Sequence, residues 1–266
     1  MEEDVYKQNL KGWRAEVGML APVAGMYREF EVVAPEGVRF SRAILGLKEV
    51  TPEALKKMAD DMLTESIKLN IGHKMDLIAL GCTSGSFIGG PGYDQKIIKM
   101  IEDATGVPTT TTSTALLVAF KDLGIKKIAM CGPYEKEIFD AAIDFFNGAG
   151  IETLNLEYLG YHKSEEYWEY RHNPYPVYKL VRDSHKAAPD ADCVFISCMW
   201  SRILGMVDTA EAEIGKPVIS ACSAVMYHIL KMLGISDLVY HYGQLLQRPR
   251  LAPMPIAPTV SYVSKS

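Results

Sequence analysis

The stretch Asp76-Leu-Ile-Ala-Leu-Gly-Cys82-Thr83-Ser84-Gly85-Ser86-Phe-Ile-Gly-Gly90 decides the fold of this chain. It starts with a short apolar run of the kind that forms a fully buried strand. At Gly81 the composition changes, and a thiol at Cys82 is followed by hydroxyls and glycines. In open parallel α/β sheets, ligands bind beyond the carboxyl ends of the strands. The stretch therefore predicts a parallel α/β sheet with the Cys82 thiol and several backbone N–H groups facing one crevice.

A second copy of this arrangement occurs later in the chain, where Asp192-Cys-Val-Phe-Ile-Ser197 reads as a strand that ends at Cys198. The segments that follow the two cysteines also correspond: Gly106-Val-Pro108, Ser113-Thr-Ala115 and Leu123-Gly-Ile125 after the first, and Gly215-Lys-Pro217, Cys222-Ser-Ala224 and Leu233-Gly-Ile235 after the second. This correspondence indicates a duplicated β-α-β-α unit. Alternating strands and helices predict parallel sheets. We therefore expect an α/β fold of two pseudo-symmetric lobes, each with a parallel sheet flanked by helices, and an active site in the cleft between them.

The duplication also suggests where each lobe begins and ends. We expect residues 1–125 and 216–247 to form the lobe with the first cysteine and residues 126–215 to form the lobe with the second. Residues 248–266 carry several prolines and are expected to be an irregular tail. Thr51 is a predicted helix N-cap because Pro52 and Glu53 follow it. Residues 26–46 are expected to be irregular.

Composition and charge argue against several classes of protein. The chain has 266 residues, 48% of them hydrophobic, and a net charge of −5 with scattered lysines, which argues against a nucleic-acid partner. No apolar run reaches the roughly 18 residues of a membrane span, and the acidic N-terminus does not resemble a secretory signal. We therefore expect a cytoplasmic protein with no membrane partner. The five cysteines lack metal-binding spacing, and the glycines form no dinucleotide fingerprint, so we expect neither a metal nor a cofactor.

Two opposed thiols suit chemistry at a carbon atom. One sulfur can attack or deprotonate one face of the substrate, and the other can deliver a proton to the opposite face. The thiolate is the working form, so we expect the thiol pKa to be lowered from about 8.5 by helix N-termini and nearby N–H groups. The same N–H groups, with the hydroxyls of Thr83 and Ser84, can hold a carboxylate or a developing enolate. The remaining cysteines are interpreted as structural: Cys131, Cys193 and Cys222.

The motif Gly81-Cys-Thr-Ser-Gly-Ser-Phe-Ile-Gly89 resembles the first cysteine motif of the maleate cis–trans isomerases and the matching loop of the arylmalonate decarboxylases. Both families belong to the aspartate/glutamate racemase superfamily. Three further segments are similar to these families: Ile196-Ser-Cys198, Gly215-Lys-Pro-Val-Ile-Ser220 and Pro133-Tyr-Glu135. The resemblance runs from about Val17 to Tyr242. It implies a two-lobed α/β fold that works without a metal or an organic cofactor.

The resemblance also implies roles for individual residues. It assigns the nucleophile to Cys82 and the acid/base partner to Cys198. It places Thr83, Ser84 and Tyr134 around a substrate carboxylate, and it puts Asn173 where the isomerases carry a carboxylate-binding asparagine. The remaining residues of the expected substrate-binding set are Met199, Val23 and Gly25.

The sequence departs from both families in an instructive way. The turn Pro22-Val23-Ala24-Gly25 is closer to the apolar loop of the decarboxylases than to the isomerase turn, which carries an asparagine near this position. The decarboxylases, however, normally keep only the second cysteine, whereas this chain has both. The aromatic-rich stretch from Tyr158 to Tyr178 is interpreted as a packed lobe surface or subunit contact, with a wall of the substrate cavity as the alternative.

Four functions remain open at this point. The leading hypothesis is a cofactor-independent cis–trans isomerase of a small unsaturated dicarboxylate that uses Cys82 and Cys198. The first alternative is a decarboxylase of substituted malonates, and the second is a racemase that uses both thiols. A non-catalytic protein that binds small carboxylates ranks below these. The expected partner is a small carboxylate substrate, and a homodimer is an allowed assembly.

Overall fold

Two four-stranded parallel sheets organise the computed structural model, which describes residues 12–23, 28–71, 74–161, 163 and 166–249. The first sheet has the order β2-β1-β3-β4, and the second has the order β6-β5-β7-β8. The strands are β1 (Ala15–Ala21), β2 (Val38–Ile44), β3 (Leu77–Leu80), β4 (Thr109–Thr111), β5 (Lys127–Tyr134), β6 (Glu152–Tyr161), β7 (Cys193–Ile196) and β8 (Val218–Ser220). The repeated strand order confirms the predicted duplication and the two-lobed α/β fold.

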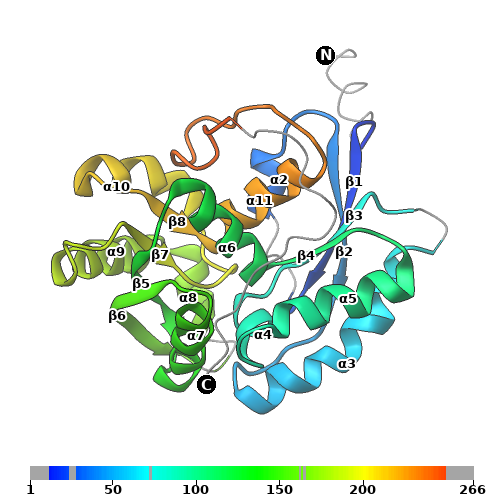
Figure 1. Cartoon of the computed structure of the whole chain (residues 1–266), viewed down its shortest axis with the longest axis horizontal. Helices are drawn as coiled ribbons and strands as arrows, with labels where there is room; N and C mark the ends of the chain where they lie inside the picture. The colour runs from blue at the N-terminus through cyan, green and yellow to red at the C-terminus, as the bar shows by residue number, and fades with distance from the viewer. Residues whose placement is uncertain (1–11, 24–27, 72–73, 162, 164–165, 250–266) are drawn as a thin grey trace.

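Helices flank both sheets, and Figure 1 shows the first sheet with its helices on one side of the molecule and the second sheet on the other. The helices are α2 (Arg28–Val33), α3 (Pro52–Leu69), α4 (Thr83–Phe87), α5 (Tyr93–Thr105), α6 (Thr112–Leu123), α7 (Lys136–Gly148), α8 (Glu166–His172), α9 (Tyr175–Ala187), the 3-10 turn η1 (Leu204–Met206), α10 (Val207–Ile214) and α11 (Ala221–Met232). The predicted cap is confirmed, because the Thr51 hydroxyl accepts the Ala54 N–H at the start of α3.

The last helix of each half packs across the boundary between the lobes. α6 follows the first sheet, yet Phe120 on this helix contacts Phe146 and Phe195 of the second lobe. α11 follows the second sheet and contacts β3 and α2 of the first lobe. The two helices also pack against each other (Figure 1). This exchange holds the two sheets in a fixed relation, with the ends of β3 and β7 facing a common space.

The expected lobe boundary needs a correction at β8. Residues 216–247 were assigned to the first lobe, but Val218–Ser220 pairs with β7 in the second sheet. The reason is that β7 pairs with β5 along one edge and needs a neighbour for the backbone groups of its other edge. The following helix α11 does contact the first lobe.

The expectation that residues 26–46 are irregular is also wrong. They contain α2 and β2, and β2 pairs in parallel with β1 along its whole length. β2 is the outer strand of its sheet, and its residues alternate irregularly between buried and exposed positions. Such a strand lacks the continuous apolar run by which a buried parallel strand is recognised.

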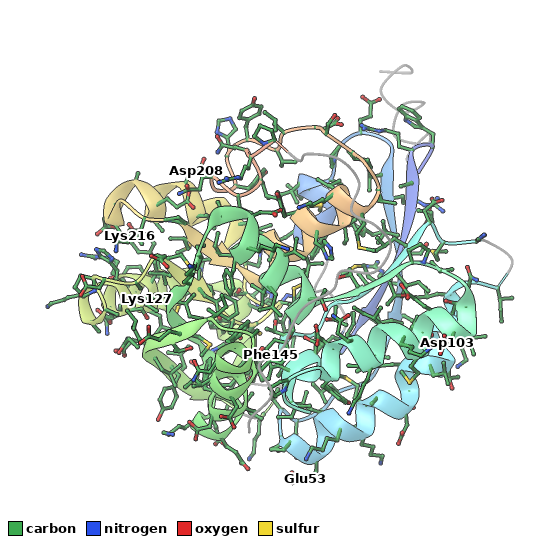
Figure 2. The ribbon with its side chains drawn as sticks, viewed as in Figure 1. Glu53, Asp103, Lys127, Phe145, Asp208 and Lys216 are labelled. Carbon is green, nitrogen blue, oxygen red and sulfur yellow. The ribbon has the colours of Figure 1, made fainter. Side chains whose placement is uncertain are left out.

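The core lies between the sheets and their helices, and among the described residues most charged side chains lie outside it, with Glu16, Asp94 and Lys231 as buried exceptions. Figure 2 shows the labelled side chains of Glu53, Asp103, Asp208 and Lys216 at the periphery, whereas Phe145 lies in the interior and is fully buried. Within the part of the chain that the structure describes, no helix has the length and apolar character needed to cross a membrane.

Candidate active site

Cys82 lies directly beyond β3 and caps the short helix α4. Its Sγ accepts the Gly85 N–H at 3.3 Å and lies 3.8 Å from the Ser84 hydroxyl. The turn is tight because Gly85 has no side chain: a Cβ there would lie 2.6 Å from Met58 Cε and 3.0 Å from the Cys82 Sγ. The sequence shows the hydroxyls and glycines that follow Cys82, but it did not predict this helix. The helix has only 5 residues, or about one and a half turns. The result is a buried thiol that accepts a hydrogen bond from a backbone N–H group.

Cys198 occupies the corresponding place beyond β7. Its Sγ accepts the Trp200 N–H at 3.4 Å, and the Tyr134 hydroxyl at the end of β5 also hydrogen-bonds to this thiol. The backbone of Cys198 has φ of +93°, a left-handed conformation that a residue with a side chain rarely adopts. The bend turns the chain sharply after Ser197 and brings the thiol and the following N–H group together.

The two thiols line one cavity of about 40 Å³. Its polar lining comes from Cys82, Thr83, Ser84, Tyr134 and Cys198, which are all at most 6% exposed. The apolar and aromatic lining is Pro22, Val23, Leu47, Val50, Tyr167, Met199 and Trp200, with Gly81 beside Cys82. A cavity of this size holds only a few water molecules, so the thiols meet in a small space.

Most of the predicted site residues meet in this cavity. Cys82, Cys198, Thr83, Ser84 and Tyr134 all line it, as do Met199 and Val23. The predicted Gly25 lies outside the described residues.

Asn173 lies apart from the other predicted site residues, and its role in binding a carboxylate stays a prediction. It is exposed and does not line the cavity; its Oδ1 accepts the Tyr175 N–H at 3.1 Å at the start of α9. The side chain serves the local turn before a helix, which is a common role of asparagine.

The environment of the thiols also differs from the expectation. Burial raises the pKa of Cys82 to about 11, although the Gly85 N–H and the Ser84 hydroxyl oppose this shift. Burial raises the pKa of Cys198 to about 12, although the Trp200 N–H and the Tyr134 hydroxyl oppose it. The expected lowering of the thiol pKa is therefore wrong for the unliganded site, because desolvation outweighs the hydrogen bonds. Both thiols are protonated near neutral pH.

Two hydroxyl groups in the cavity, those of Tyr134 and Thr83, can hydrogen-bond to a ligand. Burial raises the pKa of Tyr134 well above its ordinary value, so its hydroxyl keeps the proton and can donate it in a hydrogen bond. The Thr83 Oγ1 is buried and has no hydrogen-bond partner among the described residues. Buried polar groups are usually paired, so this hydroxyl is available to an oxygen atom placed in the cavity.

Several lining residues were not singled out from the sequence. Tyr167 belongs to the aromatic stretch and forms part of the cavity wall, which is the alternative interpretation of that stretch. Trp200 follows the second cysteine motif by two positions, and this proximity was its only signal. Leu47 and Val50 were missed because they follow β2, the strand that the sequence did not reveal.

The described residues include no group of three or more His, Cys, Asp or Glu side chains that could hold a metal ion. The cavity itself presents two thiols, phenols, hydroxyls and backbone N–H groups. Such a set can add sulfur to carbon, deliver a proton and hold a carboxylate oxygen.

The sequence of the chain is similar to those of known arylmalonate decarboxylases and maleate isomerases. The chain matches the family model described as arylmalonate decarboxylase over residues 17–246. A maleate isomerase from Geobacillus stearothermophilus is 27% identical over 245 residues, which cover 86% of this chain and 96% of the relative. An arylmalonate decarboxylase from Bordetella bronchiseptica is 25% identical over 224 residues, which cover 82% and 90% of the two chains.

Solved structures agree with these sequence matches. A liganded arylmalonate decarboxylase in which one glycine is replaced by cysteine and one cysteine by serine gives a TM-score of 0.81 at 25% identity, covering 87% of this chain and 98% of that one. The maleate isomerase of Pseudomonas putida S16 gives a TM-score of 0.78 at 26% identity, covering 88% and 98%. Because the family model spans most of the sequence, this chain belongs to the arylmalonate decarboxylase family.

Proposed function

We propose that the protein is a cofactor-independent cis–trans isomerase of a small unsaturated dicarboxylate of the maleate type. The observation that carries this proposal is the pair of thiols, Cys82 and Cys198, that line one small cavity from the corresponding strand ends of two sheets. Maleate isomerases are among the relatives of the chain, at 27% identity for the protein from Geobacillus stearothermophilus. Binding alone would need no nucleophile, so the paired thiols favour an enzyme over a binding protein.

The reaction starts with addition to the double bond. Cys82 gives up its proton to solvent as the substrate binds and regains one when the product leaves, and its Sγ forms a bond to one alkene carbon. The π electrons move to the other carbon and its carboxylate, which gives an enediolate. Cys198 then delivers its thiol proton to that carbon, so the former double bond is a single bond that can rotate. After rotation Cys198 takes a proton back from the same carbon, the double bond forms again, and Cys82 leaves as the thiolate.

Hydrogen-bond donors in the cavity stabilise the negative charge that develops during the reaction. Charge that develops on a carboxylate oxygen is stabilised by preorganised donors in a site from which water is excluded. The Thr83 hydroxyl lacks a partner among the described residues, and the neutral Tyr134 hydroxyl lies at Cys198. Tyr134 therefore serves the proton-transfer half of the site, while Thr83 and Ser84 serve the carboxylate.

A decarboxylase of substituted malonates is the second candidate. The apolar side of the cavity favours it, because Pro22, Val23, Leu47 and Val50 suit an apolar substituent better than a second carboxylate. In this reaction the substrate loses carbon dioxide, and Cys198 protonates the resulting enediolate. Cys82 has no necessary part, so its retention favours the isomerase.

The test is incubation of the purified protein with maleate, phenylmalonate and single enantiomers of amino acids, followed by proton NMR in D₂O. We expect conversion of maleate to fumarate that Cys82→Ser abolishes. Loss of carbon dioxide from phenylmalonate, with no change in maleate and activity retained in Cys82→Gly, would replace the isomerase by the decarboxylase. Exchange at an amino-acid α-carbon would indicate the racemase, and no conversion of any compound would favour the binding protein.

The proposal extends to location and assembly. We propose that the enzyme works in the cytoplasm, which suits its five free cysteines, and that it forms a homodimer. Light scattering coupled to size-exclusion chromatography measures the assembly directly, and a mass equal to the 29.5 kDa chain would refute the dimer.

A further inference from the structure

A second, larger cavity of about 370 Å³ lies beside the reaction cavity. We call it the outer cavity; its lining is Glu29, Val32, Val33, Arg171, His172, Trp200, Ser201, Arg202, Leu204, Gly205 and Tyr242. It opens at the surface, because Val32 is 67% exposed and Arg202 and His172 are also exposed. Nothing in the proposed reaction uses this space.

Trp200 is the residue that the two cavities share. Its indole stacks on Tyr167 of the reaction cavity, with ring centroids 5.7 Å apart and planes at 15°. It also contacts the outer cavity, where the guanidinium carbon of Arg171 lies 6.0 Å from the ring centroid. Its backbone N–H reaches the Cys198 Sγ. The indole therefore stands as a wall between the reacting thiol and the outer cavity.

The indole Nε1 of Trp200 gives an independent sign of a ligand. This atom is buried and has no acceptor among the described residues. Buried tryptophan N–H groups usually find an acceptor. Because this N–H group lies beside two cavities, it can donate a hydrogen bond to an oxygen of a bound carboxylate.

Another part of the reaction-cavity lining lies beside a contact between the lobes. Leu47 and Val50 line the cavity, and Glu49 between them pairs with Lys163 of the second lobe in an isolated antiparallel β-bridge. Among the described lining residues, only Trp200 belongs to both cavities.

Charge in the outer cavity favours an anion. Arg171 and Arg202 both line it, and guanidinium groups bind carboxylates in a bidentate manner. Glu29 opposes them, but burial raises its pKa to about 7 against the opposing effect of Arg202, so this side chain is about half ionised at neutral pH and loses its charge below it.

We propose that the outer cavity is a receiving site for small carboxylates, in which Arg171 and Arg202 bind the anion, and that Trp200 is the movable partition between this site and the reaction cavity. The proposal rests on the proposed function only for the identity of its cargo, a small carboxylate. Positive side chains around a funnel raise the local concentration of an anion and its rate of arrival. Trp200 would also limit the size of the substrate that reaches the thiols.

Alkylation of Cys82 tests the proposal without any assay of isomerase activity. Iodoacetate and iodoacetamide form the same S–CH₂ bond, release iodide and lose the thiol proton to solvent, but only iodoacetate is an anion. The protein is treated with each reagent at about pH 9, where a fraction of the thiol is ionised. Trypsin places Cys82 on residues 75–96, which contain no other cysteine, and residues 128–136 carry Cys131 as a buried reporter of unfolding.

We expect Arg202→Gln to lower the ratio of the iodoacetate rate to the iodoacetamide rate about threefold or more, and about 0.5 M salt to remove the difference. The matched control is Arg182→Gln, an exposed arginine that pairs with Glu213 and lines neither cavity; it should leave the ratio unchanged. An unchanged ratio in Arg202→Gln would overturn the receiving site.

The partition is tested with the same reagents. We expect Trp200→Ala to accelerate the alkylation of Cys82 by both reagents about tenfold, and Trp200→Phe to accelerate it less, while Cys131 stays unmodified. Wild-type rates at Cys82 in Trp200→Phe and in a folded Trp200→Ala would overturn the partition and favour access past the Glu49–Lys163 bridge. Because the readout is thiol access, a failure here is distinct from a failure of maleate turnover.

Discussion

Replacement of Tyr134 by phenylalanine removes one hydroxyl from the site and leaves the ring in place. Tyr134 is 3% exposed and its ring packs against Phe139 and Tyr167, so phenylalanine fills the same volume. The lost contact is the hydrogen bond to Cys198, which opposes the effect of burial on this thiol. A hydrogen bond to a charged partner contributes about 1.5–3 kcal/mol. If the Cys198 thiolate loses that amount, its pKa rises by about 1–2 units and turnover falls roughly 10–100-fold.

Two measurements check this result. Proton NMR of maleate conversion gives the turnover of Tyr134→Phe against the wild type. The pH dependence of Cys198 alkylation, read by tandem mass spectrometry because Cys193 lies on the same tryptic peptide, gives the pKa shift. Urea unfolding should change by no more than about 1 kcal/mol, because only one buried hydrogen bond is lost. Turnover within twofold of the wild type together with an unshifted alkylation profile would refute the role of Tyr134 at Cys198.

Four further outcomes follow from the site. Cys82→Ser should abolish isomerisation, since no base lies ready to activate a serine hydroxyl; NMR turnover above background would contradict this. Gly85→Ala should lower turnover about tenfold or more, because its Cβ would lie 3.0 Å from the Cys82 Sγ and displace it; unchanged kinetics would show that the turn absorbs the methyl group. The pKa of Glu29 is about 7 in the folded chain and takes its usual value of 4.5 in the unfolded chain. Because the folded state binds the extra proton between these values, the free energy of unfolding should fall by roughly 1–3 kcal/mol as pH rises from 4.5 to 7. Glu29→Gln should flatten that dependence in urea titrations, and an equal slope in both proteins would refute it. Activity should survive dialysis against a chelator; restoration of a lost activity by one metal ion would overturn the thiol mechanism.

The duplication is the part of the fold that the sequence predicts best. Each cysteine follows a short apolar strand, and the matching Gly-x-Pro and Leu-Gly-Ile segments repeat the order of the elements around it. Local composition says less about β2, because an outer strand with one exposed face lacks a continuous apolar run. The sheet to which β8 belongs depends on the free edge of β7, which is a property of the assembled sheet and not of residues 218–220.

Only part of the candidate site, like part of the fold, could be predicted from the sequence. The residues next to the two cysteines reach the cavity because the ends of β3 and β7 face the same space, and the sequence reveals where those strands end. Asn173 does not line this cavity, and its side chain accepts the Tyr175 N–H, a local contact that the sequence does not distinguish from a ligand contact. The raised thiol pKa values could not be predicted, since desolvation depends on residues from both lobes that surround each sulfur. The only sequence signal for Trp200 is its position two residues after Cys198, because its contact with two cavities depends on the assembled fold.

The left-handed backbone at Cys198 has a consequence for how such a sequence evolves. A residue with a side chain at φ of +93° costs about 1–3 kcal/mol relative to a relaxed backbone, and glycine would avoid that cost. The thiol is therefore kept against the conformational preference of its own residue. A change to glycine would relieve this cost but would remove the proposed acid/base group, so stability and the proposed chemistry make opposite demands on residue 198.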